Sequence, residues 1–383
     1  MKKMPASDPS FTTLVVVPID PTFPIMGGIE AYSRNLLKYF SNSGINSILL
    51  GISYNNIQTD IDGFQFIPVS HGRRINGYEY LFKLLLKTPF LRIPRSTIIY
   101  AQKPEFILPF MLFRSKNKKI VHLHGNSLKL YKGERLRLVS FFYKLVESYV
   151  LKHSNIIITT DEITRACYIR EYPWIHNKMR VIPMAIDLGS FRLLDRECLR
   201  KQYGFKENEK IIMYVGRIVK EKNLGFLLRS FSFVFESLPK SELVFVGDGK
   251  EMADLKQLSI DLQLSKVRFM GNQQPEKIPE ILNCADVLVL CSTSEGSPNV
   301  VKEALACGVP VVSTPVGDVP TVIVNDKIGK IVDADPRKFA EAIIEFCLNN
   351  QKDLTRMECA KIASNFSFDK MGIKITEVMK ELF

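Results

Sequence analysis

Short apolar runs rich in β-branched residues alternate with stretches of helical periodicity along the whole of this 383-residue chain. In the first half these runs cover residues 13–18, 47–51, 64–68, 97–100, 119–123, 155–159 and 179–183. In the second half they cover residues 211–215, 242–246, 267–270, 286–290 and 309–313. Strands that are apolar almost throughout and are separated by helices belong in parallel sheets covered on both faces. The pattern therefore predicts an α/β fold with doubly wound parallel sheets.

The strand–helix pattern restarts near Lys210, after a polar stretch over 192–210. A chain of this length accommodates two domains of about 100–200 residues each. We predict two Rossmann-like domains, at 1–188 and 189–364, that face each other across a cleft, with a last helix at about 365–383 packed back on the first domain. Open parallel sheets bind ligands at the carboxyl ends of their strands, so we expect the site in that cleft.

The excess positive charge lies entirely in the first half of the chain. Residues 1–187 hold 25 Lys and Arg against 13 Asp and Glu, whereas the remaining residues hold 27 of each. This asymmetry indicates an anionic partner for the first domain: a membrane surface, a phosphate-bearing acceptor or nucleic acid. Because no nucleic-acid recognition motif accompanies the charge, we predict no nucleic-acid partner.

Two basic segments of the first half also contain aromatic residues, a combination that suits an anionic membrane surface and a lipid-diphosphate acceptor. Two ordinary amphipathic helices with solvated lysines would give the same pattern. The basic residues are Lys83, Lys87, Arg92 and Arg95 near Phe90, and Lys129, Lys132, Arg135, Arg137 and Lys144 near Phe141, Phe142 and Tyr143.

The cysteines and the hydropathy pattern both bear on the compartment. The seven cysteines are odd in number and form no Cys-x-x-Cys pair, which favours a reducing compartment over a disulfide framework. The N-terminus lacks the apolar core of a signal peptide, and no apolar run approaches the roughly 18 residues that span a bilayer. We therefore expect a cytoplasmic protein that associates peripherally with the inner face of the cell membrane.

Two glutamates eight positions apart follow the predicted strand 286–290. Glu295 lies in the polar loop after the strand, and Glu303 lies about one turn into a helix that begins near Asn299. The backbone N–H groups at this helix start, around Ser297, Asn299 and Val300, can hold an anion. A carboxylate at Glu303 can accept both hydroxyls of a vicinal diol such as a ribose. The alternative is a surface capping pattern with two solvated glutamates.

Two cations follow the predicted strand 211–215. Gly216 ends the strand, and Arg217 and Lys222 precede the next helix. Arg217 can contact phosphate oxygens in a bidentate manner, and Lys222 supplies a point charge, so the segment is typical of a diphosphate site. The alternative is a solvated basic loop.

The loop after the first strand contains Gly27 and Gly28, which would let the backbone approach a phosphate closely. It does not match Gly-x-Gly-x-x-Gly, and an ordinary strand–helix turn would explain it equally well. Farther along, His122 and His124 alternate with apolar residues and should share a face. A metal would need further ligands there, and none is evident.

These segments together resemble glycosyltransferase family 4, a retaining family with the two-domain GT-B fold. The family pattern is Glu, seven residues, Glu, then Ala-x-Ala-x-Gly-x-Pro-Val-Val, and a Gly-Arg-x4-Lys segment precedes it. In this chain the pattern corresponds to Glu295, Glu303, Ala304, Ala306, Gly308, Pro310, Val311 and Val312, preceded by Gly216, Arg217 and Lys222.

The resemblance implies a role for each matching residue of the second half. Glu303 would hold the nucleotide ribose, and Glu295 would contact the transferred sugar close to the reacting carbon. Arg217 and Lys222 would stabilise the leaving diphosphate. Gly247, in a Gly-Asp-Gly after a strand, and Gly271, in a Phe-x-Gly, match positions near the donor.

The first-half motifs match the family more loosely. Gly27 and Gly28 would meet the donor phosphate, and His124 would reach the donor sugar, while for His122 we favour a structural role. The family's Ile-Pro-Asn-Gly-Val-Asp strand is present, but Met184-Ala185 replaces the Asn-Gly pair. We therefore do not assign a donor contact to that strand.

The resemblance implies a hexosyltransferase of cell-surface polysaccharide or glycoconjugate synthesis. The donor would be a nucleotide diphosphate sugar carrying a hexose or N-acetylhexosamine, with UDP favoured over GDP. The acceptor would be a glycan or a polyprenyl-diphosphate-linked sugar. We expect no cofactor and no metal, because the cations Arg217 and Lys222 can replace a metal on the diphosphate, and neither Asp-x-Asp sequence, at 60–62 and 333–335, belongs to the motifs above.

Two rival functions use the same fold. A nucleotide-sugar 2-epimerase would share the phosphate and ribose contacts but act without an acceptor. A non-catalytic partner subunit would keep the fold, and the intact Glu295, Glu303, Arg217 and Lys222 argue against it.

Overall fold

The chain folds into two compact units in a computed structural model. The first unit combines residues 1–184 with 368–383, and the second comprises residues 185–367. The structure describes residues 11–23, 28–54, 60–61, 63–73, 75–125 and 137–383. The predicted boundaries at 188 and 364 fall a few residues from these. At the junction, Ile186 pairs with Ser367 in a parallel bridge, so the two connecting segments run side by side within the second unit.

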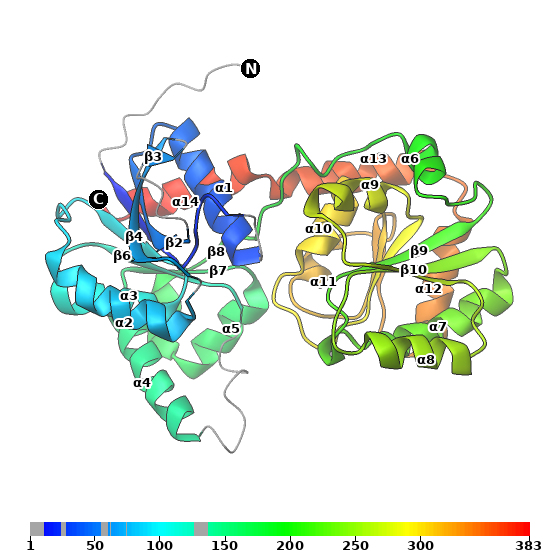
Figure 1. The fold of residues 1–383 in the computed structure, drawn as a ribbon, viewed down its shortest axis with the longest axis horizontal. Helices are drawn as coiled ribbons and strands as arrows, with labels where there is room; N and C mark the ends of the chain where they lie inside the picture. Colours follow the sequence, from blue (N-terminus) through cyan, green and yellow to red (C-terminus); the bar gives the residue numbers. More distant parts are fainter. Residues whose placement is uncertain (1–10, 24–27, 55–59, 62, 74, 126–136) are drawn as a thin grey trace. The chain divides into compact units, whose positions relative to one another are not determined.

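The first unit is built on an eight-stranded sheet in the order β3-β4-β2-β1-β5-β6-β7-β8 (Figure 1). Every neighbouring pair is parallel except β3 with β4. The strands are β1 Thr13–Val16, β2 Ser47–Ser53, β3 Asp60–Ile61, β4 Phe64–His71, β5 Ile98–Ala101, β6 Lys119–Leu123, β7 Ile156–Thr159 and β8 Met179–Val181. Central strands such as β5 and β7 are buried along their whole length, which is why they read as continuous apolar runs.

Helices cover both faces of this sheet. They are α1 Gly28–Asn42, α2 Gly77–Lys87, α3 Pro104–Phe113, α4 Arg137–His153, α5 Glu162–Glu171 and α14 Phe368–Lys380, with short 3-10 turns η1 Thr88–Phe90 and η4 Pro173–Lys178. Tyr80, Phe106 and Tyr168, from α2, α3 and α5, contribute to one core with the sheet.

The C-terminal helix α14 belongs to the first unit, where it packs against α1. Gly372 permits this contact, because a Cβ there would lie 2.3 Å from ring atoms of Tyr39 on α1. The helix end is also tied down by an ion pair of 2.6 Å between Arg180 and Glu381.

The second unit has a fully parallel six-stranded sheet in the order β11-β10-β9-β12-β13-β14. The strands are β9 Lys210–Val215, β10 Ser241–Val246, β11 Val267–Gly271, β12 Val287–Leu290, β13 Val311–Ser313 and β14 Gly329–Ile331. The helices are α6 Arg196–Gln202, α7 Leu224–Ser237, α8 Met252–Asp261, α9 Ile278–Asn283, α10 Asn299–Ala306, α11 Val319–Val322, α12 Pro336–Leu348 and α13 Lys352–Ala363, with 3-10 turns η5 Lys220–Lys222, η6 Pro275–Lys277 and η7 Ser364–Phe366.

Two apolar layers sandwich this sheet. One lies between the sheet and α9, α10 and α13, and the other between the sheet and α7 and α12 (Figure 1). Both faces of the sheet are therefore covered, as the near-continuous apolar strands predict.

A buried ionic cluster anchors the start of β12. The Asp286 side chain is 1% exposed and forms ion pairs of 2.6–2.7 Å with Arg196, Arg200 and Lys352. Its carboxylate also accepts a hydrogen bond of 2.8 Å from the Ile211 N–H. Burial opposes ionisation, but these three cations hold the pKa of the Asp286 carboxyl well below its usual range. The cluster joins α6, β9, β12 and α13.

The strands that the sequence predicted all occur, and two additional short ones were missed. The two-residue β3 and the three-residue β14 are too short to show a hydropathy period. Asp335, in the second Asp-x-Asp sequence, caps α12, because it accepts the N–H groups of Arg337 and Lys338 at the start of the helix. Among the described residues, no helix combines the length and apolar character needed to cross a bilayer.

Candidate functional site

The strand order of the second sheet reverses between β9 and β12. β10 and β11 lie to one side of β9, and β12, β13 and β14 continue on the other. Loops at such a reversal separate and leave a crevice at the carboxyl ends of the strands, where ligands bind in open parallel sheets. The loop after β9 carries Gly216, Arg217 and Lys222, and the loop after β12 carries Glu295. The two strongest sequence motifs therefore lie at the two strands that flank the reversal.

The loops after β9 and β12 contact each other directly. Lys222, in η5, donates to the Glu295 carboxylate, and both side chains are mostly buried, at 17% and 14% exposure. Ser292 donates a second hydrogen bond to the same Glu295 oxygen at 2.7 Å. The Thr293 N–H donates to the Glu221 carbonyl at 2.9 Å, which joins the two backbones. Glu295, which the sequence assigned to the sugar, and Lys222, which it assigned to the diphosphate, thus belong to one hydrogen-bonded group.

The predicted glycines bring the ends of β9, β10 and β11 into close contact. A Cβ on Gly247 would lie 1.9 Å from the Gly216 carbonyl oxygen, and the φ of Gly247 is +135°. The Gly247 N–H donates to the Gly271 carbonyl at 2.8 Å. No other residue type fits at Gly247, so no side chain covers the backbone at this position.

Arg217 lies at the same edge and is exposed. Its carbonyl accepts the Tyr214 hydroxyl at 2.8 Å, which fixes the backbone, while its guanidinium has no hydrogen bond or ion pair with any described residue. Burial raises the pKa of the Tyr214 hydroxyl, with Cys291 and Glu295 acting in the same direction. Arg217 can therefore turn toward an anion without breaking an existing contact.

Glu303 lies in the second turn of α10 and is partly buried. Burial raises the pKa of its carboxyl to about 7, against the opposing charge of Lys302. Within the described part of the chain its carboxylate has neither a hydrogen bond nor an ion pair. A buried carboxylate in this situation gains from hydroxyl donors, which a vicinal diol would supply.

Residues 295–299, which the sequence assigned to the donor and which we therefore call the donor loop, are held on the other side by a network that the sequence did not reveal. Ser297 donates to Asp318 at 2.7 Å, and the Lys302 ammonium lies 2.6 Å from both Ser297 Oγ and Asp318 Oδ2. The Ser297 hydroxyl is therefore already engaged. Neighbouring Asn299 keeps its side-chain oxygen buried without a partner among the described residues, and Val300 is partly buried. No sequence motif predicts the pairing of Lys302 with Asp318, because Asp318 lies beyond the next strand, β13.

In the first unit, the strand order reverses between β1 and β5. Gly28 is the first residue of α1, the helix that follows β1, whereas Gly27 lies outside the described residues. His124 follows β6 and stacks on His122 with ring centroids 4.1 Å apart, which confirms that the two share a face. Its Nε2 is hydrogen-bonded to the Gln102 side chain.

The two histidines differ in their surroundings. His122 is fully buried, and its Nδ1 lies 2.6 Å from the Tyr100 hydroxyl, which in turn lies 2.9 Å from the Tyr32 hydroxyl. His124 is only partly buried, and its Nδ1 lacks a partner among the described residues. Burial, with help from Lys103, lowers the pKa of His124 to about 3, so it is a neutral hydrogen-bonding group at physiological pH. The structure thus places His122 in a core network, and each ring keeps one nitrogen, Nε2 of His122 and Nδ1 of His124, without a partner among the described residues.

Neither Asp-x-Asp sequence joins the donor loop. Asp62 lies outside the described residues, and Asp335 is occupied as the cap of α12. Throughout the described ranges, no three His, Cys, Asp or Glu side chains are grouped as metal ligands. Metal independence stays a prediction.

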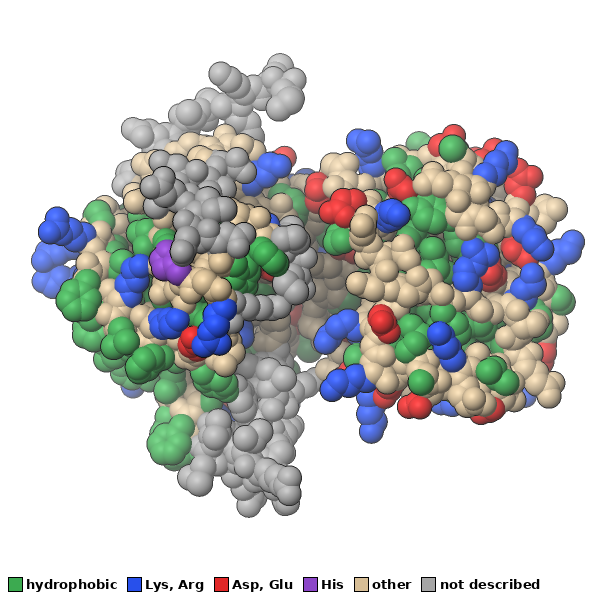
Figure 2. All heavy atoms as spheres, viewed as in Figure 1, with side chains coloured by type: hydrophobic (Ala, Val, Ile, Leu, Met, Phe, Trp, Pro, Cys, Tyr) green, Lys and Arg blue, Asp and Glu red, His purple; other side chains and the backbone are tan. Residues whose placement is uncertain are grey.

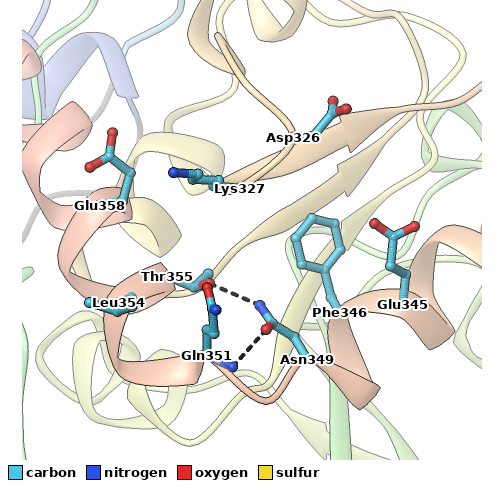
Figure 3. Close-up of a pocket in the computed structure, with 9 residues that line it drawn as sticks. All are labelled: Asp326, Lys327, Glu345, Phe346, Asn349, Gln351, Leu354, Thr355 and Glu358. Atoms are coloured by element: carbon cyan, nitrogen blue, oxygen red, sulfur yellow. Dashed lines mark hydrogen bonds between the residues drawn. The ribbon is translucent and has the colours of Figure 1, made fainter.

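A surface cavity of about 440 Å³ lies in the second unit, away from these residues (Figure 3). It is bordered by α12, α13 and the segment before β14, and Asn349 bridges Thr355 and Gln351 at its edge. None of the predicted site residues lines it, so it is separate from the donor loop.

The basic segments of the first unit are less uniform than the sequence suggests. Lys83 contacts Ser70 and Glu79, and Lys87 contacts the Pro68 carbonyl, so the ammonium groups of both α2 lysines reach β4. Arg92 and Arg95 are exposed. Lys144 forms an ion pair with Glu171 at 2.8 Å, while Lys129, Lys132 and Arg135 lie outside the described residues and the side chain of Arg137 is not described.

Comparison with known proteins matches both halves of the chain. The family "Glycosyl transferases group 1" matches residues 195–365, and "Glycosyltransferase Family 4" matches residues 26–190. An uncharacterized glycosyltransferase of Methanocaldococcus jannaschii is 32% identical over 54% of this chain and 51% of its own length. The UDP-Gal:alpha-D-GlcNAc-diphosphoundecaprenol alpha-1,3-galactosyltransferase of Escherichia coli is 28% identical over 68% of each chain. The matches thus span about half to two thirds of these relatives.

The fold is also that of solved glycosyltransferases. The structure of sucrose-phosphate synthase from Thermosynechococcus elongatus superposes with a TM-score of 0.80 at 19% identity, over 97% of this chain and 99% of the other. That likeness concerns the fold, while the two family matches together cover nearly all of the sequence. The chain belongs to glycosyltransferase family 4, with the two Rossmann-like units of the GT-B fold.

Proposed function

We propose that this protein transfers a hexose or N-acetylhexosamine from a nucleoside diphosphate sugar to a glycan or lipid-linked acceptor, with retention of the anomeric configuration. The observation that carries the proposal is the grouping of Arg217, Lys222, Glu295 and Glu303 around the β9–β12 reversal. UDP is the favoured nucleotide, because a relative that matches 68% of the chain is named for a UDP-sugar donor and a lipid diphosphate acceptor.

Each of these residues has a part in donor binding. The Arg217 guanidinium, which is exposed, takes the diphosphate in a bidentate manner. Lys222 bridges the diphosphate and the Glu295 carboxylate to which it already donates. Glu303 accepts the ribose hydroxyls, and the bare backbone at Gly247 and Gly216 lets the nucleotide approach the sheet edge.

The reaction breaks the bond between the anomeric carbon and the β-phosphate oxygen. The acceptor hydroxyl oxygen bonds to the same face of that carbon, and its proton passes to the departing phosphate. Negative charge that develops on the diphosphate is stabilised by Arg217 and Lys222, and such fixed charges are worth most in a site that excludes water. Glu295, held by Lys222 and Ser292, orients the transferred sugar.

A donor and acceptor screen tests the proposal. Binding of UDP and GDP is measured by calorimetry, and sugar transfer from a panel of nucleotide sugars is followed with lipid-diphosphate acceptors, with the anomeric configuration of the product read by NMR. We expect UDP binding and an α-linked product from an α-linked donor. An inverted product would overturn retention. Formation of the 2-epimer of the donor sugar without an acceptor would establish the 2-epimerase instead.

We further propose that the first unit docks on an anionic membrane surface, where a lipid-linked acceptor lies. Large apolar side chains are exposed at every fourth position along α2 and η1: Tyr78, Phe82, Leu86 and Phe90, at 59–85% exposure. A spacing of four places them along one side of the helix. This stripe is followed by exposed Arg92 and Arg95, and Figure 2 shows hydrophobic and basic side chains gathered over α2 and α3. Apolar side chains flanked by cations are the combination that binds anionic bilayers.

A further inference from the structure

A fully buried cation, Lys302, lies beside the donor loop. Its side chain is 0% exposed, in the middle of an otherwise apolar face of α10. It pairs at 2.6 Å with Asp318, which is 4% exposed and follows β13. Burying such a pair costs desolvation free energy for both charges, and replacing buried ion pairs by apolar residues is often neutral or stabilising. Stability alone is therefore a weak reason for this pair.

The pair contacts the donor loop at two residues. Both charged groups contact Ser297 Oγ, at 2.6 Å from Lys302 and 2.7 Å from Asp318. The Asp318 N–H donates to the Gly296 carbonyl at 2.9 Å. Gly317 lets this happen, because a Cβ there would lie 2.0 Å from the Gly296 oxygen. The loop is thus held at two consecutive residues directly after Glu295.

Glu295 itself is held from the opposite side by Lys222 and Ser292. The loop therefore lies between two ionic contacts, Lys222–Glu295 and Lys302–Asp318, that come from four different segments of the second unit. The two contacts hold the loop at Glu295 on one side and at Gly296 and Ser297 on the other. A displacement of about 1 Å in such a segment is enough to lower turnover strongly.

We propose that Lys302 and Asp318 are positioning residues, which hold the 295–299 loop in the conformation that binds the donor and leave catalysis to Glu295, Arg217 and Lys222. This inference rests on the proposed function of the loop in donor binding. Lys302 also lies next to Glu303 in the chain, and its ammonium lies 5.3 Å from the centre of the Phe366 ring, so it is fixed from several sides.

The test compares two variants with a matched control. The double variant Lys302→Met/Asp318→Leu replaces the pair with apolar side chains of similar size, and Ser297→Ala removes the shared hydroxyl without burying a lone charge. Lys352→Met is the control, since it removes a cation from the Asp286 cluster of the same unit without touching the loop. Calorimetry with UDP, donor KM and kcat, and the melting temperature are measured for each.

We expect the double variant to melt close to the wild-type temperature and to bind UDP at least tenfold more weakly. Ser297→Ala should raise donor KM severalfold with little change in melting temperature. The pH below which donor binding weakens should move upward in the double variant, because Glu303 loses a neighbouring cation. Lys352→Met should lower the melting temperature and leave UDP affinity unchanged.

Wild-type affinity, KM and pH profile in both Ser297→Ala and the double variant would overturn the positioning role. If the double variant fails to fold, Ser297→Ala decides alone, since unchanged UDP affinity and donor KM in that variant would reject the role. A wild-type protein that binds neither UDP nor GDP would instead reject the proposed function. The two failures are therefore distinguishable.

Discussion

The Lys222 ammonium donates to the Glu295 carboxylate, although 73 positions separate the two residues in the chain. Lys222 comes from the turn after β9, and Glu295 comes from the loop after β12. The two strands are neighbours in the sheet, so their carboxyl ends meet. This contact links the residue assigned to the transferred sugar with a residue assigned to the leaving diphosphate.

Lys222→Met should lower kcat by about 10²–10³-fold, the usual effect of removing one fixed group that stabilises transition-state charge. Glu295→Gln should also cripple turnover, since it loses both the carboxylate and the contact with Lys222. Lys220→Met, in the same turn but exposed, is the control. Steady-state kinetics with saturating donor would contradict the assignment if Lys220→Met and Lys222→Met behaved alike.

Glu303→Gln should weaken UDP binding by about 1.5–3 kcal/mol, because charged hydrogen bonds to the ribose are lost. Glu341→Gln, on the exposed side of α12, should leave affinity unchanged. Calorimetry with UDP measures both. Equal affinities in wild type and Glu303→Gln would show that the ribose lies elsewhere.

The same Glu303 should make the protein's stability depend on pH. Its pKa is raised to about 7 in the folded state, above the value near 4.3 of an unfolded chain. The folded state therefore binds the proton more tightly, and the free energy of unfolding should fall as pH rises from about 4 to 7. Glu303→Gln should remove this loss and stabilise the ligand-free protein at pH 8, by on the order of 3–4 kcal/mol.

Thermal unfolding of wild type and Glu303→Gln at pH 5 and pH 8 measures the effect. A melting-temperature difference that is the same at both pH values would rule out a raised pKa. UDP affinity should fall in the wild type as pH drops below about 7, in the opposite sense to its stability.

Asp286→Asn should destabilise the second unit by about 3–5 kcal/mol, because three cations would keep no buried carboxylate. Because the pKa of Asp286 is lowered in the folded state, its ionised carboxylate adds to the free energy of unfolding above an unfolded pKa near 3.9. This stabilisation is lost as pH falls below that value. Chemical denaturation of wild type and Asp286→Asn at pH 7 and pH 3 measures the loss of unfolding free energy and its dependence on pH. Asp254→Asn, at an exposed position on α8, is the control and should change neither.

Phe82→Ser/Phe90→Ser should reduce flotation with vesicles that contain phosphatidylglycerol, since both side chains leave the exposed stripe on α2 and η1. Leu348→Ser/Leu354→Ser removes two exposed apolar side chains from the second unit and serves as the control. Binding should weaken as salt rises and be absent with neutral vesicles. Equal flotation of the two double variants would reject the stripe as the docking face.

Sugar transfer should persist in excess chelator, because Arg217 and Lys222 are expected to take the place of a metal on the diphosphate. Activity with and without EDTA at matched ionic strength measures this. Complete loss in chelator, restored by Mg²⁺ or Mn²⁺, would contradict it.

Much of the fold could be predicted from the sequence because buried parallel strands such as 287–290 are apolar without interruption. The segments that were missed, β3 and β14, are two and three residues long and have no period to detect. At the site, the chain segments carrying Arg217, Lys222, Glu295 and Glu303 could be found because each follows a strand or begins a helix.

The sequence by itself determined the alternation of strands and helices, the family, and the residue types available for a donor, because these depend on local spacing. Only the tertiary structure decided which of them touch. Strand order places β12 beside β9, and this brings Glu295 to Lys222. The fold also brings Asp318 to Lys302, and it buries Glu303 so that its pKa rises. Contacts and desolvation depend on residues that are distant in the chain and close in space, and the local periodicity of a sequence does not reveal such neighbours.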